Sequence, residues 1–261
     1  MAPARPACPV SVIMITLNEG HRIQATLQAL QWAQEIIVVD AGSTDDTVAV
    51  AQPLATLVVH HDWAGFGAQK NYALSLASLP WVLSLDADEF VTPELALEIQ
   101  NFVAQNGNGF LSATLPRLST YCGREMRHSG WWPDPVCRLF KRAHARFSDD
   151  LVHERIITTG PSAALEGLLL HDSFQNLDQV LHKLNQYSSE GALNLHRKGR
   201  TSSLGKAIGH GLWTFFRTYV FKLGFLDGRE GFILAVSNAE GTYYRYLKLM
   251  YLCEQGPSNT P

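Results

Sequence analysis

Apolar and polar residues alternate along the N-terminal part of the chain in a way that predicts strands and helices in turn. The stretch "VSVIMITLNE" at 10–19 is apolar and rich in β-branched residues until it ends in polar ones, which predicts a strand followed by a loop. Residues 21–33 place Ile23, Leu27 and Leu30 at close to helical spacing, which predicts a helix. The same pattern predicts strands at 35–40, 56–61 and 81–90, and helices at 43–51 and 67–78.

This alternation is typical of right-handed βαβ units, so we expect an α/β fold with a mainly parallel central sheet. The strands at 35–40 and 81–90 are continuously apolar, which fits a sheet covered on both faces. In such sheets, ligands bind beyond the carboxyl ends of the strands. The residues expected at these ends are polar: Asn18, Glu19, Asp40, Asp86 and Asp88. We therefore expect three strand ends to share one cleft.

The rest of the chain predicts fewer strands and longer helices. A helix at 92–104 has Thr92 as its cap and Pro93 at its first position. Strand structure is expected over 107–123, whereas 124–156 mixes aromatic, Arg and His residues without a clean period and indicates strands and functional loops. Three further helices are expected, at 177–196, 204–225 and 242–252, with a turn at 226–232 between the last two.

Composition and charge narrow the class of protein. The chain has 261 residues, 46% of them hydrophobic, which is enough for a sizeable core. A net charge of −3 argues against a nucleic-acid binder, although residues 197–250 hold nine Lys and Arg against three Asp and Glu and could face something anionic.

The cysteines and the N-terminus suggest where the protein is found. The four cysteines have neither C-x-x-C nor zinc-finger spacing, which favours reduced thiols in a cytoplasmic protein. No stretch has the pattern of a signal peptide or the length of a membrane span, so we expect a soluble protein or one peripheral on the inner face of the cytoplasmic membrane.

The stretch "VLSLDADEF" at 82–90 ends a buried strand with a cluster of acidic residues. Asp86 and Asp88 point to the same side if strand geometry continues, because side chains alternate with period two. Two carboxylates so placed repel each other unless a cation lies between them, and Mg²⁺ or Mn²⁺ prefers oxygen ligands together with substrate phosphates. The cluster therefore predicts a Mn²⁺ or Mg²⁺ site that binds a diphosphate; the alternative is a solvated acidic turn.

Four motifs, in this order, carry a resemblance to a known family: "SVIMITLNE", "IIVVDAGSTDDT", "GFGAQKNYAL" and "VLSLDADE". Over about 9–160 the chain resembles the family 2 inverting glycosyltransferases, which have the nucleotide-sugar-binding GT-A fold. "VHE" at 152–154 and "DGREG" at 227–231 resemble the branch of glucosyltransferases that add glucose to a heptose of the lipopolysaccharide inner core.

The resemblance implies a division of the chain and roles for particular residues. A GT-A catalytic domain would span 1–175, with a nucleotide-binding half at 9–90 and an acceptor-binding half at 91–175, and 176–261 would be a helical extension. The implied nucleotide-sugar ligands are Thr16, Asn18, Glu19, Asp40, Lys70 and Asp86. Among these, Asp40 would accept a hydrogen bond from uracil, Lys70 would lie near the diphosphate, and Asp86 near the ribose or metal. Asp88 would bind the metal directly. As alternatives, Lys70 could be an ordinary solvated lysine and Asn18 could simply end its strand.

Inversion at the anomeric carbon needs a base within hydrogen-bond reach of the acceptor hydroxyl. Relatives often place an acidic pair where this chain has His153 and Glu154. We expect Glu154 to be the catalytic base and His153 to contact the metal or phosphate. The alternative is a structural pair between Glu154 and Arg155 or Arg138.

Acceptor contacts are expected from three residues of the middle section. The aromatic faces of Trp131 and Trp132 could stack on sugar rings, or the two could be core residues. Arg138 could bind a phosphate with two parallel hydrogen bonds, or hold a structural ion pair.

The segment 204–225 combines an apolar stripe at helical spacing with positive charge from Lys206, Arg217 and Lys222. Such a helix can lie on an anionic bilayer surface, or its stripe can pack on the catalytic domain or a second subunit. The function that fits all of these features is transfer of a sugar, glucose from UDP-glucose, to a lipopolysaccharide core heptose. A polyprenyl-phosphate or protein acceptor, and a nucleotide-sugar-binding module without turnover, remain as alternatives.

Overall fold

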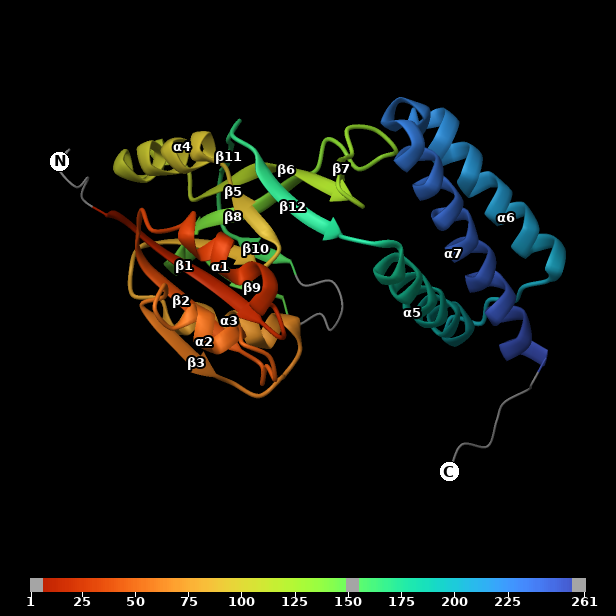
Figure 1. Ribbon diagram of the computed structural model, residues 1–261, viewed down its shortest axis with the longest axis horizontal. Helices are drawn as coiled ribbons and strands as arrows, with labels where there is room; N and C mark the ends of the chain where they lie inside the picture. The colour runs from red at the N-terminus through yellow and green to blue at the C-terminus, as the bar shows by residue number, and fades with distance from the viewer. Residues whose placement is uncertain (1–6, 149–154, 255–261) are drawn as a thin grey trace. The chain divides into compact units, whose positions relative to one another are not determined.

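The computed structural model describes residues 7–148 and 155–254, which form two compact units (Figure 1). The first unit contains Met1–Arg117 and Asp134–His171, and the second contains Leu118–Pro133 and Asp172–Pro261. The division proposed from the sequence, at 175, falls close to the second boundary, but it does not separate residues 118–133 from the catalytic part.

One sheet, with strand order β3-β2-β1-β4-β8-β6-β12-β5, forms the framework of the first unit. Its strands are β1 (Cys8–Thr16), β2 (Ala33–Asp40), β3 (Leu57–His60), β4 (Trp81–Asp86), β5 (Glu89–Val91), β6 (Ser112–Tyr121), β8 (Pro135–Lys141) and β12 (Leu169–Phe174). Strands β7 (Arg124–Glu125) and β11 (Ser162–Ala164) pair with β6, while β9 (Ala145–Phe147) and β10 (Ile156–Thr158) form a separate two-stranded sheet. The first four strands are mutually parallel, and β8 is antiparallel to β4. The expected α/β class is therefore found.

Alternating side chains of β1 face two different layers. Val12 and Met14 belong to the core shared with α1 (Gly20–Gln28), α2 (Thr47–Ala51) and α4 (Pro93–Ala104). Ile13, between them, belongs to a second core shared with α3 (Phe66–Leu76) and Phe147 of β9. This period of two explains why the buried strands read as continuously apolar.

Parallel register brings the expected strand ends together. Thr16 lies opposite Asp40, and Ile15 lies opposite Asp86, so the last residues of β1, β2 and β4 stand side by side at one edge. His60, at the end of β3, is the register partner of Asp40.

Helix boundaries follow the local chemistry. The side chain of Thr92 accepts a hydrogen bond from Leu95 N at 3.3 Å, and Pro93 opens α4, as the sequence predicts. Helix α2 begins at Thr47 rather than near residue 43, because Ser43 and Thr44 bind the strand-end side chains instead.

The second unit is built on α5 (Leu177–Arg197), α6 (Leu204–Phe216) and α7 (Gly228–Glu254), and α7 packs against both of the others (Figure 1). The helix expected at 204–225 ends at Phe216 and continues as a π-turn and a short 3₁₀ turn. The last helix is much longer than the expected 242–252. It begins at Gly228, whose positive φ of 67° agrees with the expected turn, and it includes Gly231, where a Cβ would come within 1.9 Å of Gly224 O.

Asp227, just before α7, fixes a loop of the second unit. Its buried carboxylate accepts hydrogen bonds from the backbone N–H groups of Arg127 and His128, each at 3.1 Å, and from the hydroxyl of Ser129 at 2.7 Å. Within 7–148 and 155–254, no helix is both long and apolar enough to cross a bilayer.

Candidate active site

The loop after β2 is organised around the carboxylate of Asp40. One of its oxygens accepts hydrogen bonds from the backbone N–H groups of Gly42 (2.9 Å) and Ser43 (2.8 Å). The other accepts from the hydroxyls of Ser43 (2.5 Å) and Thr16 (3.3 Å). Asp40 is therefore buried and fully bonded at the predicted strand end, and Gly42 adopts the positive φ of 98° that the tight turn needs.

Asn18 and Glu19 tie the loop after β1 to the one after β2. The side-chain oxygen of Asn18 accepts from Thr44 N at 2.8 Å, and Asn18 itself has a positive φ of 58°. The backbone N–H of Glu19 donates to the Thr47 hydroxyl at 2.8 Å, while its carboxylate pairs with Arg22 at 2.8 Å. Burial raises the pKa of Glu19, and the nearby Arg22 only partly offsets this. The two loops thus form one hydrogen-bonded unit at the carboxyl edge of the sheet.

Asp86, the last residue of β4, lies between two buried cations. Lys70 Nζ is 2.9 Å from one of its oxygens, and Arg138 Nη2 is 2.7 Å from the other. Burial alone would raise the pKa of Asp86, but Arg138 and Lys70 outweigh it and hold that pKa far below its ordinary value. Asp86 is therefore an ionised carboxylate with a cation on each oxygen.

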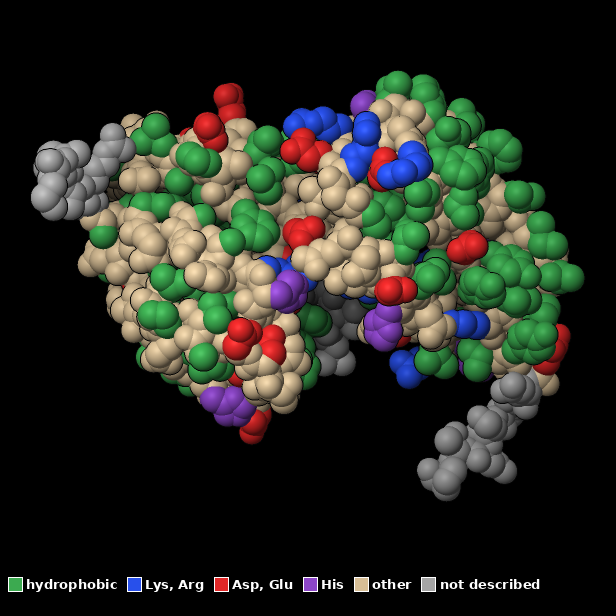
Figure 2. Space-filling view, viewed as in Figure 1, with side chains coloured by type: hydrophobic (Ala, Val, Ile, Leu, Met, Phe, Trp, Pro, Cys, Tyr) green, Lys and Arg blue, Asp and Glu red, His purple; other side chains and the backbone are tan. Residues whose placement is uncertain are grey.

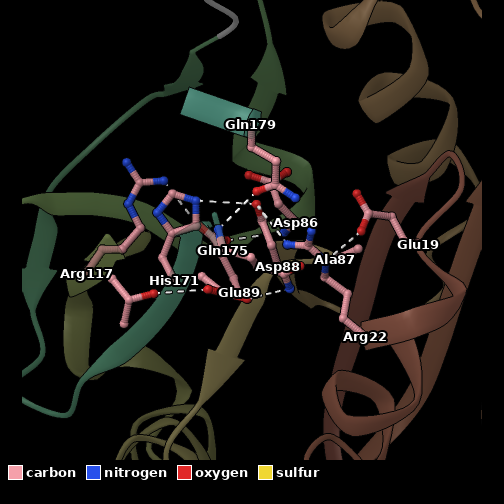
Figure 3. A network of polar contacts seen from close by, with 12 residues as sticks. Glu19, Arg22, Asp86, Ala87, Asp88, Glu89, Arg117, His171, Gln175 and Gln179 are labelled. Atoms are coloured by element: carbon pink, nitrogen blue, oxygen red, sulfur yellow. Dashed lines mark hydrogen bonds and ion pairs between the residues drawn. The ribbon is translucent and has the colours of Figure 1, made fainter. Parts of the chain in front are cut away.

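Glu89, the first residue of β5, completes this network (Figure 3). Its side chain is fully buried and lies 2.6 Å from Arg138 Nη2 and 3.1 Å from Arg117 Nη1. Its other oxygen accepts from the backbone N–H of Asp86 at 3.2 Å. Burial lowers the pKa of Arg138, yet the charges of Glu89 and Asp86 raise it above its ordinary value. Glu89 thus holds Asp86 in two ways: it bonds the Asp86 backbone N–H, and it pairs with Arg138, which in turn pairs with the Asp86 carboxylate.

Asp88 faces a different partner, His171 of β12, whose Nε2 lies 3.5 Å from an Asp88 oxygen (Figure 3). The antiparallel pairing of β12 with β5 places His171 opposite Glu89, which explains this closeness. Arg22 Nη1 lies 3.8 Å from the same oxygen. Burial alone would raise the pKa of Asp88, but His171 outweighs it, so the pKa falls below its ordinary value.

The donor set at Asp88 fits a divalent ion held by two protein ligands. A carboxylate oxygen and an imidazole nitrogen suit Mn²⁺, and Mg²⁺ or Mn²⁺ usually takes its remaining ligands from water and substrate phosphates. Both side chains are partly exposed, 25% for Asp88 and 17% for His171. Asp86 fits less well, because each of its oxygens already meets a cation. No group of three His, Cys, Asp or Glu among the residues described is arranged around one metal position.

The remaining predicted residues are placed as follows. Arg138 makes the ion pairs described above, which is the second of its two expected roles. Trp131 packs against Tyr121 and Phe174 in the second unit, with ring centroids 5.8 and 6.2 Å away. Trp132 is half-buried, with the guanidinium of Arg127 5.9 Å from its ring. His153 and Glu154 lie outside the described residues.

Three residues of this site were not singled out from the sequence: Glu89, Arg117 and His171. Glu89 belongs to the acidic cluster, but nothing in the pattern separates its buried role from an exposed one. Arg117 and His171 sit on β6 and β12, whose pairing with distant strands no local pattern gives. The one available signal for His171 is its place directly after the apolar run "LLL" at 168–170.

Known proteins resemble this chain along most of its length. The sequence model described as glycosyl transferase family 2 matches residues 11–159. An uncharacterised glycosyltransferase of Rickettsia prowazekii is 30% identical over 92% of this chain and 86% of its own length. The lipopolysaccharide core biosynthesis glycosyltransferase LpsC of Rhizobium meliloti is 29% identical over 92% of this chain and 94% of its own length.

Among solved structures, S. aureus TarS 1-349 aligns with 96% of this chain and 93% of its own, at 15% identity and a TM-score of 0.45. The expected α/β fold with helices at its C-terminal end agrees with the family match, and the expected enzyme class is confirmed. The chain belongs to glycosyl transferase family 2 and is a glycosyltransferase of the GT-A type.

Proposed function

We propose that this glycosyltransferase moves glucose from UDP-glucose to a heptose of a lipopolysaccharide core, with inversion at the anomeric carbon. The observation that carries the proposal is the paired arrangement of Asp86 and Asp88 at the end of β4, one held by two cations and the other facing His171. The likeness to LpsC supports a role in lipopolysaccharide core synthesis.

Asp88 and His171 are the residues that would hold Mn²⁺ or Mg²⁺. When bound, a divalent ion supplies positive charge that offsets the charge growing on the leaving nucleoside diphosphate. Lys70 and Arg138 keep Asp86 ionised and fixed in place, so that its carboxylate can position the ribose or the ion's water ligands. In this scheme Glu89 is a positioning residue, because it acts through Arg138 and the Asp86 backbone.

The uracil ring is proposed to bind at the joined loops after β1 and β2. Thr16, Asn18 and Glu19 line this part of the sheet edge together with Asp40. The Asp40 carboxylate already accepts four hydrogen bonds, and the one from Thr16 is the longest at 3.3 Å. A uracil N–H would therefore replace the Thr16 hydroxyl as donor to Asp40.

Proton removal from the acceptor hydroxyl is assigned to Glu154, with His153 beside it as a contact for the diphosphate. In-line attack on the anomeric carbon requires the base within hydrogen-bond reach of the attacking oxygen. Trp131 and Trp132 are proposed to contact acceptor sugars through their ring faces.

The decisive experiment measures release of UDP from UDP-glucose with Mn²⁺ and a lipopolysaccharide core acceptor. Asp88→Asn keeps the shape of the side chain but removes its charge, and we expect activity to fall by at least about a hundredfold. Asp62→Asn is the matched control, because the Asp62 side chain is fully exposed in the same unit, and it should keep full activity. Equal activity of Asp88→Asn and the wild type would overturn the proposal.

The same assay distinguishes the other acceptors and donors. Transfer to a polyprenyl phosphate or a protein, but not to lipopolysaccharide core, would keep the site and change the acceptor. Binding of UDP-glucose with no transfer to any of these would indicate a binding module. A thermal-shift panel of UDP-, GDP- and ADP-sugars, each with and without Mn²⁺, tests the donor, since a bound ligand raises the melting temperature.

We also propose that α6 rests on an anionic membrane surface, where a lipid-linked acceptor would be found. Figure 2 shows hydrophobic side chains gathered over α6, at the right of the view. Leu204, Ile208, Leu212 and Phe216 recur every fourth residue along the helix and are each about half exposed. The opposite side of α6 packs on α7 through small buried residues such as Ala207 and Gly211.

Positive charge accompanies this apolar stripe. Lys206, Arg217 and Lys222 are all exposed on α6 or just after it. Lysine and arginine near an anionic bilayer each contribute about 1 kcal/mol of attraction. The full chain should therefore sediment with vesicles containing anionic lipid, and the Arg217→Glu/Lys222→Glu variant should stay in solution. Equal sedimentation of the two proteins, or none with either, would contradict this part of the proposal.

A further inference from the structure

The second unit contains a cavity of about 240 Å³, which shares only Trp131 with the residues proposed for the transfer reaction. It lies where α5, α6 and α7 meet, with walls also from Tyr121, Trp131 and Phe174. This volume is several times the roughly 30 Å³ that one molecule of liquid water occupies, so the space is large enough for a small organic ligand. Its lining combines aromatic rings with a few polar groups, which is typical of a ligand site.

Arg245 of α7 is the polar group that most requires a partner. Its Nε is buried without a hydrogen-bond acceptor, and the guanidinium makes no ion pair with any residue described. The stem is fixed by α5, because Arg245 Nε lies only 2.7 Å from the position of a Cβ on Gly191. Buried donors are almost always bonded in native proteins, so the buried, unbonded Nε–H of Arg245 indicates a missing acceptor.

The charge in this cavity is entirely positive. Lys183 of α5 is the second cation in the lining, with its Nζ 4.8 Å from the centre of the Phe174 ring. The lining includes no Asp or Glu among the residues described. Two cations without a carboxylate between them favour an anion, and the edge of a guanidinium can bind phosphate or carboxylate with two parallel hydrogen bonds.

The rest of the lining fits a hydroxylated ring. The side chain of Asn238 has no hydrogen-bond partner among the described residues, and Ser237 shares only one long contact, 3.3 Å, with the Tyr121 hydroxyl. Both residues lie on α7, about two turns before Arg245. The lining also includes the rings of Trp131 and Phe174. Aromatic rings supply flat apolar faces on which the C–H groups of a sugar can pack.

We propose that this cavity is a binding site for a small sugar that carries one anionic group, phosphate or carboxylate. Arg245 and Lys183 bind the anion, Asn238 and Ser237 bind ring hydroxyls, and Trp131 with Phe174 packs on the ring. Every residue of the site belongs to the second unit. Binding requires neither UDP-glucose nor a metal, so it can be measured separately from the transfer reaction proposed above; Trp131 is the one residue named in both.

Isothermal titration of the full chain, without metal or nucleotide, tests the proposal with glucose 6-phosphate and glucuronate as the two sources of the anion. Inorganic phosphate, which has the anion without the sugar, and glucose, which has the sugar without the anion, are the partial probes. We expect one of the two anionic sugars to bind at least about tenfold more tightly than either partial probe. No measurable binding of either anionic sugar, or binding no tighter than that of inorganic phosphate, overturns the proposal.

Variants assign the binding to this cavity. Arg245→Gln and Asn238→Ala should each weaken binding at least about tenfold, whereas Arg229→Gln, at an 83% exposed arginine of the same unit, should leave it unchanged. Hydrogen exchange of the wild type provides a readout that needs no variant: the bound sugar should slow exchange in peptides of 234–248. Unchanged affinity in Arg245→Gln, or protection only elsewhere in the chain, contradicts the assignment.

Discussion

Replacing Arg138 by Met should destabilise the protein strongly, because it removes the cation that two carboxylates share. Arg138 Nη2 lies 2.7 Å from Asp86 and 2.6 Å from Glu89, and its own side chain is only 11% exposed. Methionine fills a similar apolar volume, so the main change is the loss of charge. Glu89, with no exposed surface, would keep Arg117 at 3.1 Å as its cation and the Asp86 backbone N–H at 3.2 Å as a hydrogen-bond donor.

The expected size of the effect follows from burial. Breaking a buried ion pair by removing one partner costs about 3–5 kcal/mol, because it leaves a charge without compensation. That is a large part of the roughly 5–15 kcal/mol by which a native domain is stable. A surface pair gives the contrast: Arg127 and Glu125 are each half exposed, so Arg127→Met should cost about 0–1 kcal/mol.

The assay is urea denaturation followed by tryptophan fluorescence, on Arg138→Met, Glu89→Met and the double variant. In the double variant no unpaired charge remains, since Asp86 keeps Lys70 at 2.9 Å and Arg117 keeps Asp134 at 2.8 Å. Its cost should therefore be smaller than the sum of the two single costs by about 0.5–3 kcal/mol. A loss below about 1 kcal/mol for Arg138→Met, or strictly additive costs, would refute the reasoning.

Three further changes test the framework. Leu83→Ala, in the middle of β4 with no exposed surface, should cost about 2–5 kcal/mol in urea denaturation, and a loss under 1 kcal/mol would mean that the core is not packed as described. Thr92→Ala removes the cap of α4 and should cost about 0.5–2 kcal/mol, whereas Thr92→Ser should restore most of it. Burial alone would raise the pKa of Glu35, but hydrogen bonds from Ser11 and Ser78 outweigh it and lower that pKa. Glu35→Gln should therefore be less stable than the wild type at neutral pH, and the gap should narrow as pH falls from the ordinary glutamate pKa of about 4.3 through the lowered pKa of Glu35; a gap that widens in acid would contradict the sign.

Local patterns predict the first half of the fold well because β1, β2 and β4 are mostly buried apolar runs. Asp40 and Asp86 end such runs, and parallel register then places them at one edge without further information. The cap at Thr92 is equally local, since a side-chain oxygen next to Pro93 defines where a helix starts.

Non-local pairing is what the pattern could not supply. His171 reaches Asp88 only because β12 runs antiparallel to β5, and nothing near His171 in the chain indicates that partner. The sequence left two roles open for Arg138, phosphate binding and a structural ion pair. Its ion pair with Glu89 favours the second role, but no periodic pattern shows that Glu89 is buried.

The C-terminal helices show a second limit. The turn expected at 226–232 is found only in its first part: Gly228 has a positive φ of 67°, whereas Gly231 lies inside α7, where a Cβ would come within 1.9 Å of Gly224 O. A residue that weakens a helix on its own is retained where tertiary packing needs its small size. The amphipathic pattern of these segments also did not indicate the cavity beside Arg245.

The central claim is that Asp88 binds a divalent ion together with the diphosphate of the donor. Electron paramagnetic resonance measures it directly, because the signal of free Mn²⁺ falls as the ion becomes bound. Addition of the wild-type protein with UDP should lower that signal more than UDP alone, Asp62→Asn should do the same, and Asp88→Asn should not. A folded Asp88→Asn protein that lowers the signal as much as the wild type would contradict the account.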